Sequence, residues 1–418
     1  MSLLAKAIKG GRRIGWSAAA QIASNGSNFI LTVLIARALE VQSLGLFAIL
    51  MSVNGFAIGI VRAWTSEPMI FKEASIRRLR SEARRSASLA MASLAGACIG
   101  FLAGLTIYLV SGDEWLALAF GVSLPFSIAQ DSVRFSLVDA GKASHAFVAE
   151  VLWLLTEVLI ILSFPKTMPF AAYVGAWGAG AALSVGFGYW RLRPRLSIRL
   201  IGSWIRSVRN VGSIYAVDYL AAGGLTAGVT FIVSAIAGLE AAGWLRAAQM
   251  LLMPLSVFTL GMNFALVPEV TRYASNGDVR SMKRLPVLYG LVVLAISIVC
   301  VTVYHFVPHT IIVQLMGDAA IGGMEVLPYA AVALAVSAIS VGPGLVLRAV
   351  GRVRASMLIK VVAAPITLLA VATGASFGGA VGSQWGLAGG TALRGTWSWG
   401  LMLTSTSSRP KKQVEGIR

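Results

Sequence analysis

Charged residues are scarce in this chain of 418 residues: they make up 12% of it, against about 25% in typical soluble proteins. Hydrophobic residues make up 57%, and the mean hydropathy is +0.79. A soluble fold would leave most of this apolar surface without a core to enter. The composition therefore favours a membrane protein.

Cysteine and histidine are rare, with two and three residues, and no nucleotide-binding motif is found. The two cysteines, Cys98 and Cys300, lie in apolar segments, which indicates buried thiols and no disulfide framework. His305 and His309 are spaced i, i+4, but no third metal ligand accompanies them. No G-x-x-x-x-G-K-[ST] phosphate loop is present, and the expected loops are too short for a catalytic domain. We therefore expect no cofactor, no metal and no enzymatic activity.

Long apolar runs are what the chain does contain. About a dozen of them are near 20 residues long, the length at which a helix crosses about 30 Å of hydrocarbon. We expect an all-α polytopic membrane protein with 12 transmembrane helices, at 14–36, 42–61, 87–110, 115–134, 145–163, 168–190, 211–237, 243–267, 286–307, 325–347, 355–376 and 383–404.

The basic residues fix the expected orientation. When the loops are assigned alternately to the two sides, 31 of the 35 lysines and arginines fall on one side or its adjoining tails, which by the positive-inside rule is the cytoplasm. Both termini are then cytoplasmic. The net charge of +18 is explained by membrane insertion and by attraction to anionic lipids, so no nucleic-acid partner is expected.

A weak repeat divides the chain in half. Leu39-Glu40 precedes Gly45, and about 200 residues later Leu239-Glu240 precedes Gly243. Six helices per half keep the halves in the same orientation, as in parallel-repeat transporters with a cleft between two lobes. We expect a six-helix lobe, a basic interfacial linker, a second six-helix lobe and a cytoplasmic tail, at 1–190, 191–210, 211–404 and 405–418.

Several motifs resemble a known family. Three parts of the chain are similar to signatures of polysaccharide-transporter proteins. They are the run Ala36-Arg37-Ala38-Leu39 followed by Leu44-Gly45-Leu46-Phe47-Ala48, the segment 315–328 and the segment 347–352. These are lipid-linked oligosaccharide (O-antigen) flippases of the MOP exporter superfamily, which are related to the MATE exporters. Glu40 departs from the family pattern, where glycine is frequent.

The resemblance implies a MATE-like V-shaped bundle in the bacterial inner membrane. It also implies that the chain flips a polyprenyl-pyrophosphate-linked oligosaccharide for exopolysaccharide, capsule or lipopolysaccharide synthesis, by alternating access coupled to an ion gradient. The partners would be the lipid-linked oligosaccharide, membrane lipids, and the polymerase and glycosyltransferases of the pathway.

Arginines at membrane depth are the first candidate substrate ligands, because an intramembrane charge costs about 2.5–3.5 kcal/mol on insertion scales. Arg394 lies in the middle of the last expected helix, where it could bind a pyrophosphate or form a structural ion pair. Arg37 and Arg246 lie at outer helix ends, and Arg62 and Arg134 at inner ends. Snorkelling to headgroups is the simplest explanation for these four, and a cavity lined by them is the alternative.

Polar side chains in the first helix are a second candidate surface. Gln21, Asn25 and Asn28 share one helix face. They could make hydrogen bonds between helices, or they could line a cavity that binds sugar hydroxyls.

Three acidic residues could couple transport to an ion gradient. Glu150 and Glu157 are two turns apart on one face of the helix at 145–163. Asp218 lies about two turns into the helix at 211–237. In the alternative interpretation, Glu150 lies at the cytoplasmic interface, and Glu157 neutralises an arginine.

Glycines spaced by four residues predict close helix contacts. Gly96, Gly100 and Gly104 form this pattern twice, and Gly55 and Gly59 form it once.

Three other functions remain open from the sequence. They are a MATE-like exporter of cationic drugs, a lipid II flippase, and a non-transporting scaffold of a glycan-assembly complex. Buried carboxylates would favour the first of these.

Overall fold

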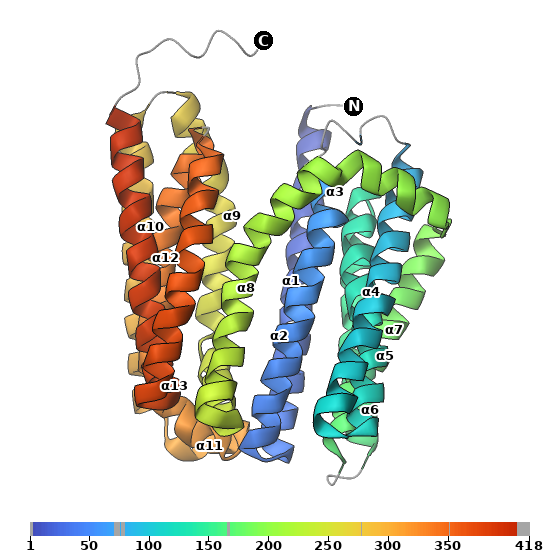
Figure 1. Ribbon diagram of the computed structural model, residues 1–418. Coiled ribbons are helices and arrows are strands. Elements are labelled where there is room, and N and C mark those ends of the chain that lie inside the picture. The colour runs from blue at the N-terminus through green and yellow to red at the C-terminus, as the bar shows by residue number, and fades with distance from the viewer. Residues whose placement is uncertain are drawn as a thin grey trace. The chain divides into compact units, whose positions relative to one another are not determined.

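The computed structural model describes residues 3–70, 76, 80–164, 168–276, 278–350 and 352–407. These residues are almost entirely helical and contain no strand. Their contacts divide the chain into two compact units (Figure 1). Unit 1 holds residues 1–43 and 49–227, and unit 2 holds 44–48 and 228–418.

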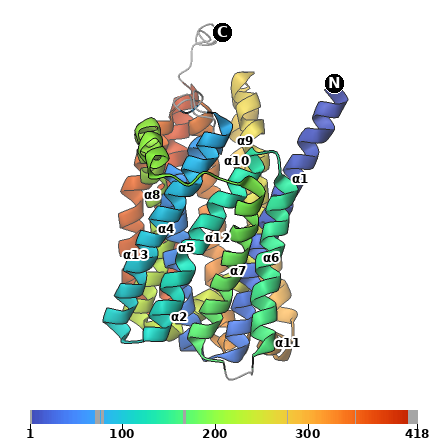
Figure 2. The same cartoon turned by 90° about the vertical axis from the view of Figure 1, so that its right-hand side faces the viewer.

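Unit 1 contains the helices from α1 to the first part of α8. Their order of packing is α4 on α5, α5 on α7, α7 on α6 and α6 on α1, and α4 to α7 lie side by side in Figure 2. The bounds are α1 (Leu3–Ala38), α2 (Val41–Trp64), α3 (Ser66–Ile70), α4 (Ser81–Ser111), α5 (Glu114–Asp139), α6 (Ala143–Ser163), α7 (Phe170–Leu192) and α8 (Ile198–Leu251).

Unit 2 contains the rest of α8 and five further helices. Within it α12 packs on α13, α10 and α9. The bounds are α9 (Met253–Ser275), α10 (Val279–Phe306), α11 (His309–Met316), α12 (Ala319–Ala349) and α13 (Val353–Ser407).

Ten of these helices are long and apolar enough to cross a membrane, so the chain is a multi-pass membrane protein. Two of the ten, α8 and α13, have 54 and 55 residues, and each is broken by glycine with non-helical backbone angles. In α8 the break is at Gly238 (φ 90°, ψ 171°), and in α13 it is at Gly378 and Gly379. The all-α fold class is confirmed, whereas twelve crossings remain a prediction.

Two expected boundaries differ from the structure. Residues 308–323, which lie between the expected helices 286–307 and 325–347, fold mostly as α11 and the first turn of α12. Residues 198–210 of the expected linker are the first turns of α8. The apolar side of these turns is buried, since Trp204 and Val208 pack with Met69 and Ala87 of unit 1. Burial of that side joins the basic segment to the helix instead of leaving it separate.

Glycine allows close helix approach in both units. In unit 1, a Cβ on Gly100 would lie 2.5 Å from the carbonyl oxygen of Gly121, and one on Gly104 would lie 2.9 Å from that of Ala117. The prediction that the α4 glycines serve helix packing is therefore confirmed. In α2 the pattern serves a different purpose, because Gly59 leaves room for the ring of Tyr219.

Close backbone contacts at glycine also join the two parts of α13 in unit 2, where the helix folds back on itself. A Cβ on Gly374 would lie 2.1 Å from the carbonyl oxygen of Gly382, and one on Gly386 would lie 2.1 Å from that of Ala370. These contacts are possible only if the two parts of α13 run antiparallel on either side of the break. Gly379 has φ 54°, a left-handed conformation that glycine adopts without strain.

Candidate functional site

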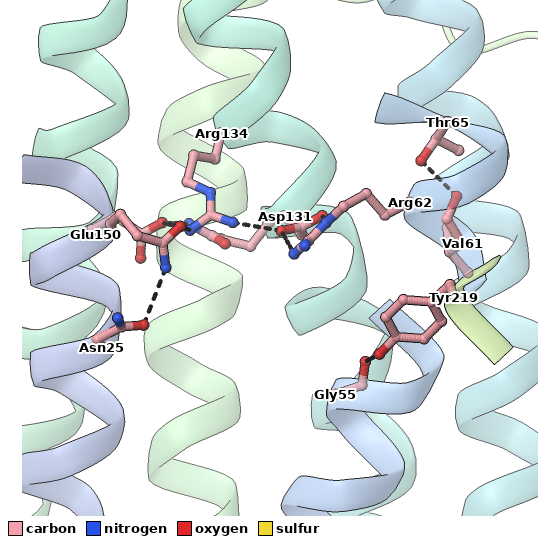
Figure 3. A network of polar contacts seen from close by, with 11 residues as sticks. Asn25, Gly55, Val61, Arg62, Thr65, Asp131, Arg134, Glu150 and Tyr219 are labelled. Carbon is pink, nitrogen blue, oxygen red and sulfur yellow. Dashed lines mark hydrogen bonds and ion pairs between the residues drawn. The ribbon is translucent and has the colours of Figure 1, made fainter. Parts of the chain in front are cut away.

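Asp131 is the centre of a buried charge network in unit 1 (Figure 3). Arg62 of α2 donates two hydrogen bonds to its carboxylate, from Nε (2.9 Å) and from a terminal nitrogen (2.6 Å). Arg134, one turn later on α5, donates a third at 2.7 Å. One carboxylate thus binds two guanidinium groups from two helices.

The network continues through Arg134 to α1 and α6. Arg134 donates to the side-chain oxygen of Gln21 at 3.1 Å, and its guanidinium lies 3.7 Å from Glu150. Gln130 donates to the same Glu150 oxygen at 2.7 Å. Gln21 in turn donates to Asn25 at 3.1 Å. Four helices of unit 1 are therefore connected by charged and amide groups.

An aromatic ring and a tyrosine complete the surroundings of Arg62. The ring of Phe135 lies under both guanidinium groups, 5.3 Å from that of Arg62 and 5.0 Å from that of Arg134, a favourable cation–π distance. Tyr219 of α8 donates to the carbonyl oxygen of Gly55 at 2.7 Å (Figure 3). This bond attaches α8 to α2 within unit 1.

The members of the network differ in their access to the surroundings. The exposed fraction of the side chain is 31% for Arg62 but 7% for Asp131, and it is 0% for Glu150. The negative charges are therefore enclosed, and the most accessible charged group is a cation.

Glu157 lies two turns beyond Glu150 on α6 and is fully buried. Ser27 of α1 donates to one of its oxygens at 2.5 Å. The other oxygen has no hydrogen-bond partner among the described residues, and no described basic side chain forms a salt bridge with Glu157. The interpretation that Glu157 neutralises an arginine is therefore not supported among the described residues. Glu150 is also buried, and its expected place at the cytoplasmic interface stays a prediction.

Snorkelling, the simplest explanation for Arg62 and Arg134, is wrong for both, because Asp131 binds them inside the helix bundle. Asp131 was not among the residues predicted from the sequence, although an aspartate three residues before an arginine in an apolar helix is a usable signal. Ser27 and Gln130 were also not selected, and nothing in their sequence context distinguishes them from other polar residues in membrane helices.

The structure also places the remaining candidates of unit 1. Asn28 donates to the backbone oxygen of Ser24 on its own helix. Arg37 is exposed in the last turn of α1. Asp218 is half-buried on α8, one residue before Tyr219.

Arg394 is the principal candidate in unit 2. It lies on α13 beside Gly395, which packs on Ser340 of α12, and its own side chain is half-buried. Within the part of the chain that the structure describes, it has neither an ion-pair nor a hydrogen-bond partner, so the alternative of a structural ion pair is not supported there. Arg246 is half-buried on α8.

No protein-family model and no curated protein match this sequence. Solved structures do match it, and they are transporters of the MOP superfamily. A multidrug-resistance MATE family transporter in its inward-facing conformation has a TM-score of 0.68 at 12% identity, covering 92% of this chain and 95% of that one. The outward-facing conformation of such a transporter has a TM-score of 0.62 at 12% identity, with 94% of each chain covered.

A MOP superfamily transporter from Pyrococcus furiosus is similar to the same degree. Its TM-score is 0.60 at 12% identity, over 94% of each chain, and it is described as having a binding pocket of reverse polarity that suggests a different function. At such identities the likeness shows the fold: this chain has the fold of MOP-superfamily transporters.

Proposed function

We propose that the chain is a secondary transporter that flips a polyprenyl-pyrophosphate-linked oligosaccharide across the bacterial inner membrane, by alternating access and without enzymatic chemistry. The observation that supports this substrate is the distribution of accessible charge. Arg62 and Arg394 are half-buried, whereas Asp131, Glu150 and Glu157 are buried. Such an arrangement suits an anionic cargo.

Arg394 is the residue that we assign to the pyrophosphate. A guanidinium group donates paired hydrogen bonds to phosphate oxygens, and that of Arg394 has no carboxylate bound to it among the described residues. Arg62 would contribute separately, within unit 1, because Asp131 binds its Nε and one terminal nitrogen and leaves the remaining donors available. Arg37, Arg246, Asn25 and Asn28 would contribute at other stages of passage.

Glu157 is the residue that we assign to ion coupling. A charged carboxylate buried without a cation costs several kcal/mol, so Glu157 would carry a proton while it is enclosed beside Ser27. Release of that proton would need an opening of the α1–α6 contact, which links protonation to helix movement. Glu150, beside Arg134, and Asp218 would have secondary roles in the same process.

The proposal places the chain between glycosyltransferases that build the lipid-linked oligosaccharide and a polymerase that extends it. It is tested with purified protein in liposomes that contain a fluorescent pyrophosphate-linked oligosaccharide lipid. Accessibility of the label to an external quencher measures translocation. We expect movement of this lipid and no movement of a neutral lipid-linked sugar with the same glycan. Equal movement of both would remove the charge argument.

A second candidate is a MATE-like exporter of cationic compounds. It is supported by the buried carboxylates Glu150 and Glu157 and by the solved structures described as multidrug transporters. Ethidium loaded into the same liposomes distinguishes the two candidates. Export of ethidium driven by a proton gradient, without movement of the lipid-linked oligosaccharide, would favour this second candidate.

A further inference from the structure

A basic pocket lies in unit 1, away from the charge network, at the end where α4 begins and α7 ends. Its volume is about 730 Å³. Six basic residues line it, together with a single acidic residue, Glu82. The six are Arg80, Arg85, Lys142, Arg191, Arg193 and Arg195.

Three separate segments of the chain form this pocket, and each is held in place. Lys142, between α5 and α6, donates to the backbone oxygen of Arg191 at 2.8 Å. Arg193 ends α7 in a left-handed conformation (φ 47°, ψ 55°), so the chain turns there. The backbone N–H of Arg195 then donates to Ser86 of α4 at 3.1 Å. The basic side chains are thus gathered by the fold and not by a single charged run.

The guanidinium groups in this pocket are not all neutralised. Arg85 pairs with Asp139 at 3.1 Å, and Arg191 stacks on Trp190 and contacts His145. In contrast, Arg80, Arg193 and Arg195 are exposed and form no salt bridge within the described ranges. Six cations that converge around a single carboxylate, Glu82, repel one another, and an anion bound among them reduces that repulsion. Guanidinium groups select phosphate because their donors match its oxygens.

The apolar neighbours of the pocket indicate that the phosphate belongs to a membrane lipid. Trp190, which also lines it, is 62% exposed, and the nearby Ile198 is 82% exposed. The membrane-spanning helix α7 ends at Leu192, so the pocket lies at the level of the headgroups, where tryptophan is frequent. Basic pockets between helices at this level can bind the headgroups of anionic lipids.

We propose that this pocket is a specific binding site for the phosphate of an anionic phospholipid headgroup. The site is independent of the transported substrate and of the charge network around Asp131. Arg80, Arg193 and Arg195 would bind the phosphate oxygens, and Trp190 would lie against the adjoining glycerol and upper acyl region.

The test compares two triple variants of the full-length protein in detergent. One variant combines Arg80→Gln, Arg193→Gln and Arg195→Gln, and so removes the three arginines of the pocket that form no salt bridge among the described residues. A second variant combines Arg199→Gln, Arg206→Gln and Arg209→Gln, three exposed arginines in the neighbouring turns of α8 that are not among the residues lining the pocket. Binding of cardiolipin, phosphatidylglycerol, phosphatidylcholine and inorganic pyrophosphate is measured by native mass spectrometry or by titration.

We expect saturable binding of the two anionic lipids, a loss of at least tenfold in affinity in the pocket variant, and less than a twofold loss in the α8 variant. Equal losses in the two variants would show non-specific surface attraction and would overturn the proposal. Binding of phosphatidylcholine as tight as that of phosphatidylglycerol would also overturn it. Tight binding of pyrophosphate at this pocket, with no preference for the lipids, would identify a soluble phosphate compound as the ligand instead.

A double variant is available in case the triple variant of the pocket does not fold. If the triple variant does not give a monodisperse protein, the double variant Arg80→Gln and Arg195→Gln keeps Arg193 at the end of α7 and retains the bond from the backbone of residue 195 to Ser86. The same ranking of lipids and the same contrast with the α8 variant are expected, with a loss of at least fivefold.

Discussion

The two units differ in how deeply their intramembrane charged side chains are buried. The charged residues that are buried among the described residues all lie in unit 1, namely Asp131, Arg134, Glu150 and Glu157. Unit 2 instead keeps Arg394 and Arg246 half-buried. Charges that are enclosed and paired stabilise one arrangement of helices, whereas Arg394, which is half-buried and has no carboxylate partner among the described residues, remains available to a ligand. We therefore expect substitutions of the buried charges in unit 1 to lower stability, and a substitution of Arg394 to lower transport.

The largest effect on stability is expected for Asp131→Asn. This variant leaves two guanidinium groups without their carboxylate inside the helix bundle, and loss of one partner of a buried pair costs about 3–5 kcal/mol. Unfolding in detergent by a denaturing surfactant measures it. Asp139→Asn is the control, because Asp139 is more exposed than Asp131 (21% against 7%) and binds one arginine instead of two, so its pair should contribute less than about 1 kcal/mol. Equal losses in both variants would show that the network has no special role in stability.

A smaller loss is expected where helices meet at glycine. Gly374→Ala in unit 2 and Gly100→Ala in unit 1 place a Cβ within 2.1 Å and 2.5 Å of a backbone oxygen, and such overpacking costs about 1–3 kcal/mol. Gly389→Ala is the control, because no heavy atom lies within 4 Å of its Cβ position. Alanine should stabilise the helix there by up to about 1 kcal/mol. If the three variants unfold alike, the close contacts at Gly374 and Gly100 are not important for stability.

Ser27→Ala tests the contact between α1 and α6 in unit 1. The variant removes the hydrogen bond to the buried Glu157 carboxyl, so the free energy of unfolding should fall by about 1 kcal/mol. It should also change the dependence of transport on the proton gradient, because Glu157 loses its partner. Ser163→Ala is the control, because the hydroxyl of Ser163 is exposed and donates to the backbone of its own helix. The free energy of unfolding and the dependence of transport on the proton gradient should both stay unchanged in this variant. A change in stability without any change in coupling would assign Glu157 a purely structural role.

Much of the fold could be predicted from the sequence because bilayer thickness fixes helix length. The apolar runs locate the main helices, and the α4 glycines mark a real helix contact. The sequence could not predict that α8 continues through the basic segment, since that depends on Trp204 entering a core formed by distant residues; its indole N–H donates to the backbone oxygen of Trp64 at 2.8 Å.

The charge network was only partly predictable, for a related reason. Glu150, Arg62 and Arg134 could be selected because each is a charge in or beside an apolar helix. The contact of Asp131 with both arginines depends on how α2 and α5 pack, and periodicity along one helix carries no information about its neighbour. The same holds for Ser27, whose bond to Glu157 joins residues 130 positions apart.

The smallest expected effect on stability is that of Arg394→Gln, and this variant tests the central claim most directly. Without a partner to lose, it should change the free energy of unfolding by less than about 0.5 kcal/mol. Translocation of the pyrophosphate-linked lipid in liposomes should fall by about tenfold to a hundredfold, as expected for the loss of a charge-assisted contact worth about 1.5–3 kcal/mol. Arg272→Gln, an exposed arginine of unit 2, should transport like the unmodified protein. Full translocation by Arg394→Gln at equal protein density would contradict the account.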